Sequence, residues 1–197
     1  MTKYELIDQL IDKSDGIIKT SDAVAAGVSK TFFYNYAKDR GLKQASHGVY
    51  ISSDAWTDAM YLLHVRCPQA VFSHDTALFL HDLTDREPLR YTVTVRSGYN
   101  PWRLTADNIK VYTVKPALHE LGLSKGETAF GRTVPIYDME RTVCDIIRSR
   151  NDIEVQTFQD ALKQYVRRGD KNLRRLTQYA QAFRVEKILR QYLEVLL

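Results

Sequence analysis

Four glycines divide the first fifty residues into short segments with different hydrophobic patterns, and this division limits the possible fold more than any other feature. Gly16, Gly27 and Gly41 each follow a segment with helical spacing, and Gly48 lies between two short β-type segments. Glycine commonly ends helices and forms tight turns because it adopts positive φ without steric cost. The sequence therefore predicts three helices and then a β-hairpin.

Residues suited to cap a helix N-terminus stand before each of these helical segments. Thr2 precedes the first, either Thr20 or Ser21 precedes the second, and Ser29 precedes the third, which covers residues 30–40. Such side chains accept a hydrogen bond from an otherwise unpaired backbone N–H in the first turn. The hairpin is expected over residues 42–51, with its turn at residues 46–48.

Helix, short helix, glycine turn, helix and hairpin, in this order, outline a winged helix-turn-helix domain, which we place at residues 1–52. The third helix offers free N–H groups and lysines for phosphate, and Thr and Asn side chains for base edges. We therefore predict binding to double-stranded DNA. The predicted DNA-binding residues are Ser29, Lys30, Thr31, Tyr34, Asn35, Lys38, Lys43, Gln44, Ser46 and His47.

The simpler alternative is that these polar residues only solvate one face of a small helical domain. Residues 1–50 carry 7 basic and 6 acidic side chains, so the first segment has a net charge of only +1. DNA binding consequently requires the acidic first helix to face away from the phosphates.

The second part of the chain, residues 53–197, has the pattern of a mixed α/β or α+β domain that ends in a bundle of helices. A helix is expected from Ser53, with Trp56, Met60 and Leu63 on one stripe, until Pro68 ends it. The expected strands cover residues 90–95, 109–114 and 133–137, where Pro135 indicates an edge strand. The further expected helices begin after Ser73, Asp138, Glu154 and Asn172, and the last covers residues 185–197.

Two sets of polar side chains in this part deserve comparison with catalytic sites. His74 and His81 lie seven positions apart, but no third metal ligand has suitable spacing, so packing and capping roles are favoured. Asp138, Glu140 and Asp145 could serve a metal-dependent nucleic-acid-processing enzyme, yet Asp138 already suits a helix N-cap. The sequence contains neither a P-loop nor a GxSxG motif. We expect no catalytic activity, no metal and no other cofactor.

Several segments together resemble the AbiEi family of type IV antitoxins, and the resemblance covers nearly the whole chain. They are the winged-helix opening, Ser73–His74 with Ala77–Leu78, His81–Leu83, and the strand that leads into Asp138-Met-Glu-Arg-Thr-Val-Cys-Asp145. Glu140-Arg-Thr142 followed by Asp145 is the most specific of these elements.

This resemblance implies an autorepressor that binds inverted repeats in its own promoter through the N-terminal domain. It also implies an antidote to AbiEii, a nucleotidyltransferase toxin of an abortive phage-infection system, carried by the C-terminal domain and acting without a stable toxin complex. The aromatic Phe32-Phe33-Tyr34 in the third helix departs from the family pattern and leaves the operator sequence open. We expect a monomer in solution and more than one copy on the operator.

The last part of the chain is the basic pole of the protein. Residues 161–197 carry 9 basic and 3 acidic side chains, within a chain whose net charge is +4. A solvated helix face explains such density as well as a second phosphate-binding surface does. The tentative residues of this second surface, which the antitoxin function would use, are Arg167, Arg168, Lys171, Arg174 and Arg175.

Other classes of protein are disfavoured by what the sequence lacks. Cys67 and Cys144 lie far apart with no second cysteine near either, which excludes zinc ribbons and redox CxxC pairs and suggests buried thiols. No apolar run approaches the ~18 residues of a membrane span, and the N-terminus has no signal-peptide core. We therefore expect a cytoplasmic protein with no membrane partner. A winged helix that binds another protein instead of DNA is a further alternative.

Overall fold

The computed structural model describes residues 2–196 and divides into two compact units, Met1–Arg66 and Cys67–Leu197. We call them unit 1 and unit 2. Leu197, the expected last residue of the final helix, and Met1, the first residue of the expected N-terminal domain, lie outside the described residues.

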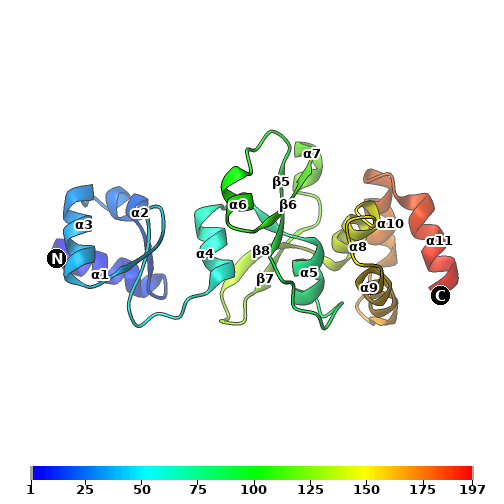
Figure 1. Cartoon of the computed structure of the whole chain (residues 1–197), viewed down its shortest axis with the longest axis horizontal. Helices are drawn as coiled ribbons and strands as arrows, with labels where there is room; N and C mark the ends of the chain where they lie inside the picture. The colour runs from blue at the N-terminus through cyan, green and yellow to red at the C-terminus, as the bar shows by residue number, and fades with distance from the viewer. Residues whose placement is uncertain (1, 197) are drawn as a thin grey trace. The chain divides into compact units, whose positions relative to one another are not determined.

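Unit 1 contains the three helices expected before the hairpin (Figure 1). The Thr2 and Ser29 side chains cap the first and third helices as predicted, whereas the second has no side-chain cap, because it begins at Thr20 directly after a strand. The Thr20 hydroxyl is instead buried. The helices are α1 (Lys3–Lys13), α2 (Thr20–Ala25) and α3 (Lys30–Asp39).

A small antiparallel sheet completes unit 1. Its strands are β1 (Ile17–Lys19), β2 (Lys43–Ser46) and β3 (Val49–Ile51), arranged in the order β1-β3-β2. Strands β2 and β3 form the hairpin predicted for residues 42–51, and Gly48 takes φ +71° at its turn. The core between this sheet and the helices contains Ile7, Ile18, Ala23, Val28, Phe33 and Tyr36.

The boundary between the units differs from the expected domain boundary at residues 52 and 53. Helix α4 (Ala59–Arg66) belongs to unit 1 because Tyr61, Leu62 and Val65 pack against buried residues of the small sheet. These sheet residues are Ile17, Val49 and Ile51.

The predicted start of this helix at Ser53 is also wrong. Residues 53–58 form turns and irregular backbone, and Trp56 has 77% of its surface exposed instead of joining an apolar stripe. The Asp58 carboxylate accepts a hydrogen bond from the Tyr61 N–H at 3.0 Å, so a later capping residue sets the helix start.

Unit 2 is built on a five-stranded mixed sheet in the order β6-β5-β4-β8-β7 (Figure 1). Within it, β4 is antiparallel to β5 and parallel to β8, β5 is parallel to β6, and β7 is antiparallel to β8. The strands are β4 (Val71–Phe72), β5 (Thr92–Arg96), β6 (Lys110–Val114), β7 (Leu123–Glu127) and β8 (Thr133–Tyr137).

The prediction that residues 133–137 form an edge strand is wrong, since β8 lies between β4 and β7. The β4–β8 pairing consists of Phe72 and Ile136 alone, whereas β7 pairs with β8 along its full length. A proline is tolerated in β8 because one side of this strand has so short a ladder.

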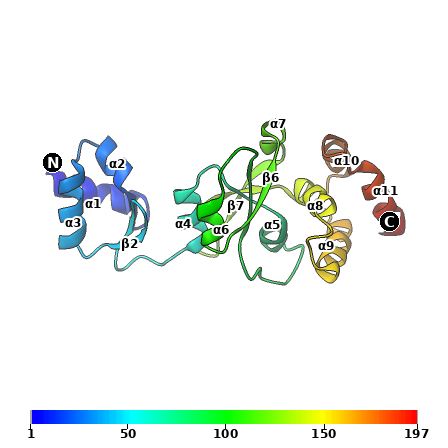
Figure 2. The same cartoon turned by 45° about the horizontal axis from the view of Figure 1, so that its top comes forward.

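The sheet of unit 2 carries helices that lead into the expected C-terminal bundle. Helix α8 contacts α5, α9, α10 and α11, and Figures 1 and 2 both show it between α5 and the later helices. The whole chain is thus a mixed α+β protein. The helices are α5 (His74–Leu80), α6 (Trp102–Ala106), α7 (Pro116–His119), α8 (Met139–Arg148), α9 (Val155–Arg167), α10 (Leu173–Ala182) and α11 (Glu186–Leu196).

Candidate nucleic-acid interface

Helix α3 is fixed at both ends by local sequence. The Ser29 hydroxyl accepts a hydrogen bond from the Phe32 N–H at 3.3 Å and caps the N-terminus. Gly27 takes φ +90° in the turn from α2, and Gly41 takes φ +65° just after the helix. Both glycines occupy backbone conformations that other residues adopt at a cost, so the turns on each side of α3 are specified by sequence.

The inner face of α3 is anchored to the rest of unit 1. Phe33 and Tyr36 are buried, and the Tyr36 hydroxyl donates to the Asp8 carboxylate of α1 at 2.5 Å. Burial and this hydrogen bond raise the pKa of Tyr36. Arg40 donates to the second Asp8 oxygen at 2.9 Å, so one carboxylate holds two side chains from the end of α3.

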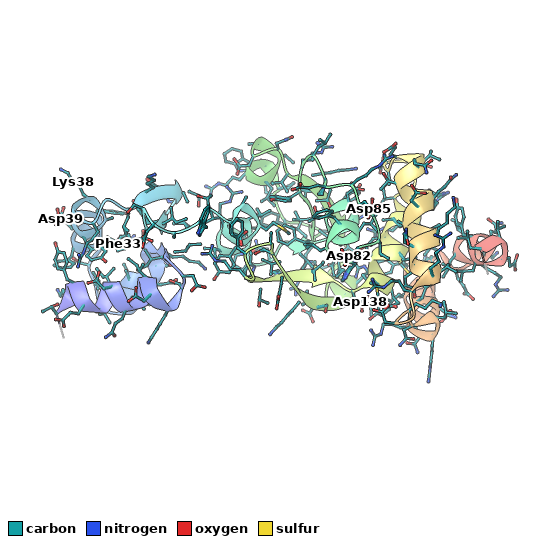
Figure 3. All side chains as sticks on the ribbon, turned by 90° about the horizontal axis from the view of Figure 1, so that it is seen from below. Phe33, Lys38, Asp39, Asp82, Asp85 and Asp138 are labelled. Atoms are coloured by element: carbon teal, nitrogen blue, oxygen red, sulfur yellow. The ribbon has the colours of Figure 1, made fainter. Side chains whose placement is uncertain are left out.

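The outer face of α3 carries the residues predicted to contact DNA. Lys30, Thr31, Tyr34, Asn35 and Lys38 are exposed. Among the described residues, the side chains of Lys30, Thr31, Asn35 and Lys38 form no hydrogen bond or ion pair. In Figure 3, Phe33 points toward the remainder of unit 1 and Lys38 points outward. This polar row therefore has hydrogen-bonding capacity that the fold does not use.

The four predicted DNA-binding residues of the hairpin differ in exposure. Lys43, Gln44 and His47 are exposed, but the Gln44 side-chain amide donates to the Ser46 carbonyl at 3.3 Å. The Ser46 hydroxyl is buried within the hairpin and cannot contact DNA without rearrangement, so this prediction is corrected. The pairing register shifts between Gln44 and Ser46, so the Ser46 side chain points to the other face of the hairpin. Simple alternation of side chains along a strand does not predict such a shift.

Tyr50 was not among the predicted interface residues, although it connects the hairpin to α3. Its ring lies 5.2 Å from the Phe33 ring in an edge-on contact and 6.4 Å from the Tyr34 ring, centroid to centroid. The sequence carried a signal for this role, because Tyr50 alternates with the buried Val49 and Ile51. Helix and hairpin are thereby held side by side.

Acidic side chains of unit 1 gather elsewhere. A cleft of about 500 Å³ is lined by Asp8, Asp12, Asp15 and Asp54, with Arg40 as its one basic residue. The exposed row of α3 does not contribute to this cleft. Asp8 and Asp12 of α1 therefore line a surface to which Lys30 and Lys38 do not contribute, as binding of these lysines to phosphates would require.

The second predicted basic surface is largely engaged within unit 2. Arg168 forms a two-pronged ion pair with Asp170, at 2.8 and 2.9 Å, and Lys171 donates to the Arg168 carbonyl. Arg175 lies 3.8 Å from both Asp138 and Glu140. Of the five predicted residues, Arg167 and Arg174 are exposed and form no ion pair with any described residue.

The acidic residues considered above as part of an enzyme site, Asp138, Glu140 and Asp145, are hydrogen-bonded within the fold. The Asp138 carboxylate caps α8 by accepting from the Arg141 N–H at 2.8 Å, as predicted. Glu140 is buried and accepts from the Tyr165 hydroxyl at 3.1 Å and the Asn172 N–H at 2.9 Å. No group of three His, Cys, Asp or Glu side chains suited to a metal ion occurs among residues 2–196.

Arg141 is the largest fully buried side chain of the protein. Its guanidinium donates to Asp145 at 2.9 Å and to the Leu118 and Leu121 carbonyls at 2.7 and 2.6 Å, and it lies 3.9 Å from the centre of the Tyr137 ring. Burial raises the pKa of Asp145, and the neighbouring arginines counteract part of that rise. The segment before β7 is thus tied to α8.

The two histidines compared with metal ligands have structural positions. His74 is buried, stacks on the Tyr112 ring at 3.5 Å, and contacts the Ser73 and Ser149 hydroxyls at 3.0 and 3.2 Å. Helix α5 begins after Ser73, as expected, but the Ser73 side chain makes no cap hydrogen bond and contacts His74 instead. His81 lies just beyond α5 and its ring donates to the Tyr137 carbonyl at 2.7 Å. Cys67 and Cys144 are buried free thiols, as expected.

Comparisons with known proteins bear on the fold alone. No known family model matches this sequence, and no curated protein matches it. The crystal structure of the RV2827C protein from Mycobacterium tuberculosis is similar, with a TM-score of 0.62 and 13% sequence identity over 92% of this chain and 72% of that chain. This similarity shows that the α+β fold also occurs in that protein. Within residues 2–196, no helix has the length and apolar character needed to cross a membrane.

Proposed function

We propose that unit 1 is a winged helix-turn-helix domain that binds double-stranded promoter DNA. The observation that carries the proposal is the row of unpaired polar side chains on α3, a helix whose opposite face is buried and held by Asp8. In this proposal α3 enters the major groove and the β2–β3 hairpin is the wing beside it. Unpaired donors on a rigid helix suit DNA because little conformational entropy is lost on binding.

The roles within the interface follow from side-chain chemistry. Lys30, Lys38 and Lys43 contact phosphates, which supplies most of the affinity and makes it dependent on salt. Thr31 and Asn35 reach base edges, where an Asn amide pairs well with adenine. Two copies bound to inverted repeats would place two such helices in successive major grooves.

For the whole chain we propose an antitoxin of the AbiEi type that represses its own operon and counters a nucleotidyltransferase toxin through unit 2, without a stable complex. The resemblance carried by Glu140-Arg-Thr142 and Asp145 supports this role, although these residues stabilise the fold. Because they are occupied in this way, we propose no catalytic role for them. Arg167 and Arg174 are the residues we assign to antitoxicity.

DNA binding is tested with the double variant Lys30→Ala/Lys38→Ala. Promoter affinity, measured by fluorescence anisotropy at several salt concentrations, should fall, and the salt slope should decrease by about 1 for each lost phosphate contact. The matched control is Lys3→Ala/Lys13→Ala on α1, which should bind like the unchanged protein. Unaltered binding by the α3 variant would exclude the proposed interface.

Antitoxicity is tested by reversing only the two unpaired arginines, as Arg167→Glu/Arg174→Glu. Growth rescue during toxin expression should be lost while promoter affinity is retained. Lys115→Glu/Lys187→Glu changes the net charge equally at exposed positions of the same unit and is expected to rescue. Full rescue by the Arg167→Glu/Arg174→Glu protein would show that the basic surface is only a solvated helix face.

A further inference from the structure

Unit 2 contains a cleft of about 750 Å³ that the proposed function does not use. Its floor is apolar and comes from Val71 of β4, Leu123 of β7 and Pro135 of β8. Leu123 is 50% exposed, although it lies in a strand of the central sheet. The cleft therefore has the size and the apolar lining that small-molecule sites commonly have.

The sheet register explains why these side chains share one face. Phe72 pairs with Ile136, so their neighbours Val71 and Pro135 both point to the opposite face. Pro135 pairs with Lys125, and Leu123 lies two positions from Lys125 on that same face. The alternation of three strands thus brings apolar side chains together.

His119, at the end of α7, lines the cleft and is only 5% exposed. Both of its ring nitrogens are buried and neither forms a well-aligned hydrogen bond within the described residues, although backbone groups of Thr94 and Gln69 lie near the ring. Burial lowers its pKa, which keeps the imidazole neutral near pH 7, and the backbone at Thr94 and Gln69 opposes this shift only in part. Buried polar atoms without well-aligned partners are rare and costly, so the ring can still take up a better-aligned hydrogen-bond partner from the cleft.

The charges beside the cleft cancel. Arg96 and Glu120 both line it and form an ion pair at 2.6 Å. With a neutral His119, the lining has no net charge, which favours an uncharged occupant over a phosphate or a carboxylate. The remaining lining comes from Pro68, from the aromatic ring of Tyr99 and from the side-chain amide of Gln69.

We propose that this cleft binds an uncharged planar heterocycle of the nucleobase type, presented as a nucleoside. The heterocycle lies on the floor of Val71, Leu123 and Pro135 and against the Tyr99 ring. Its hydrogen-bonding edge meets the Gln69 amide and the imidazole of His119. A flat ring with donors and acceptors along one edge matches an apolar floor bounded by an amide and a neutral imidazole.

The test measures binding of adenosine, guanosine, cytidine and uridine to the full chain by saturation-transfer NMR and calorimetry. At least one nucleoside should bind at concentrations up to about 5 mM, as expected for a small, weakly polar ligand. Leu123→Glu should weaken that binding by about tenfold or more, because it places a charge on the apolar floor. The matched control is Leu89→Glu, a fully exposed position outside the cleft, which should bind normally.

Two further variants address His119 and Gln69. Gln69→Ala should weaken binding several-fold and change the preference among the four nucleosides, since it removes a contact to the base edge. His119→Phe keeps a ring of similar shape and should weaken binding without altering the fold, as followed by circular dichroism. Absence of binding by all four nucleosides, or equal binding by the unchanged protein and Leu123→Glu, would overturn the proposal.

Discussion

Helices α3 and α8 have similar N-termini, but their polar side chains have opposite environments. Each starts with a side-chain cap, Ser29 or Asp138, and each carries several charged or amide side chains. In α3 the side chains of Lys30, Asn35 and Lys38 are exposed and unpaired. In α8, by contrast, Glu140, Arg141 and Asp145 are buried and hydrogen-bonded. The comparison teaches that a polar motif can bind a partner only where the fold leaves its atoms unpaired.

The largest expected effect is on α8. Arg141→Met should lower the free energy of unfolding by about 3–5 kcal/mol, because the buried Asp145 carboxylate loses its nearest partner and keeps only Arg148 at 3.5 Å. Chemical denaturation at pH 7 measures the change. Lys38→Ala on α3 is the control and should leave the unfolding midpoint unchanged.

The double variant Arg141→Met/Asp145→Leu sharpens this comparison. It removes the whole charged pair, so part of the lost stability should return, since replacing both partners of a buried pair is far less costly than removing one. If Arg141→Met alone unfolds like the unchanged protein, the buried network does not hold α8 in place.

A smaller loss of stability is expected when the hydrogen bond from Tyr165 to Glu140 of α8 is removed. Tyr165→Phe removes the hydroxyl that donates to Glu140 and should cost about 1.5–3 kcal/mol, the usual range for a hydrogen bond to a charged group. Tyr34→Phe on α3 is the matched change and should leave stability unaltered, because that hydroxyl is on the exposed face. Equal losses in the two variants would contradict the contrast between the helices.

His74 contacts Ser149, the residue that ends α8, and gives a prediction for pH dependence. Burial lowers its pKa well below the usual value, so the unfolded chain takes up a proton before the folded one does. Its contribution to stability is therefore complete above about pH 6.5 and decreases as the pH falls, by at most about 1.4 kcal/mol per pH unit.

The test compares the unchanged protein with His74→Asn, which tolerates the positive φ of +48° at this position. The difference in unfolding free energy between the two proteins should shrink from pH 7.5 to pH 5.5. A difference that stays constant would show that His74 is not held neutral by burial.

The smallest effect belongs to the cap of α3. Ser29→Ala should lower stability by about 1 kcal/mol, and Ser29→Gly by only a few tenths, because glycine leaves the first N–H groups open to water. Thermal unfolding measures both. If Ser29→Ala instead costs as much as Arg141→Met, the exposed cap of α3 matters as much for stability as the buried network of α8, and the contrast between the two helices fails.

The sequence predicted those elements whose signals are local. Apolar residues at helical spacing and a suitable cap identified α1, α3 and α8, and the glycine turn identified the β2–β3 hairpin. Strand β7 was missed because its side chains are mostly exposed and show no alternation, and β4 was missed because it has two residues. Long-range packing forms both of these strands.

The candidate interface could be predicted in part for the same reason. Exposure of the α3 row follows from helical periodicity, and nine of the ten predicted residues are exposed. The engagement of Arg168, Lys171 and Arg175 could not be predicted, because their partners depend on how α8, α9 and α10 pack. Neither could the cleft at His119, which combines three strands with the end of α7.

The two-residue strand at the centre of the larger sheet has a consequence for the order of folding. Its parallel partner is reached only through the pairing of Phe72 with Ile136, 136 − 72 = 64 positions later, whereas the widest strand pairing in unit 1 joins Ile17 to Ile51, 51 − 17 = 34 positions apart. Closing a longer loop costs more entropy and slows folding. During synthesis, unit 1 has all of its strands before the sheet of unit 2 can close, so a ribosome-bound chain forms the surface of α3 and the β2–β3 hairpin, which we propose binds DNA, before it forms unit 2.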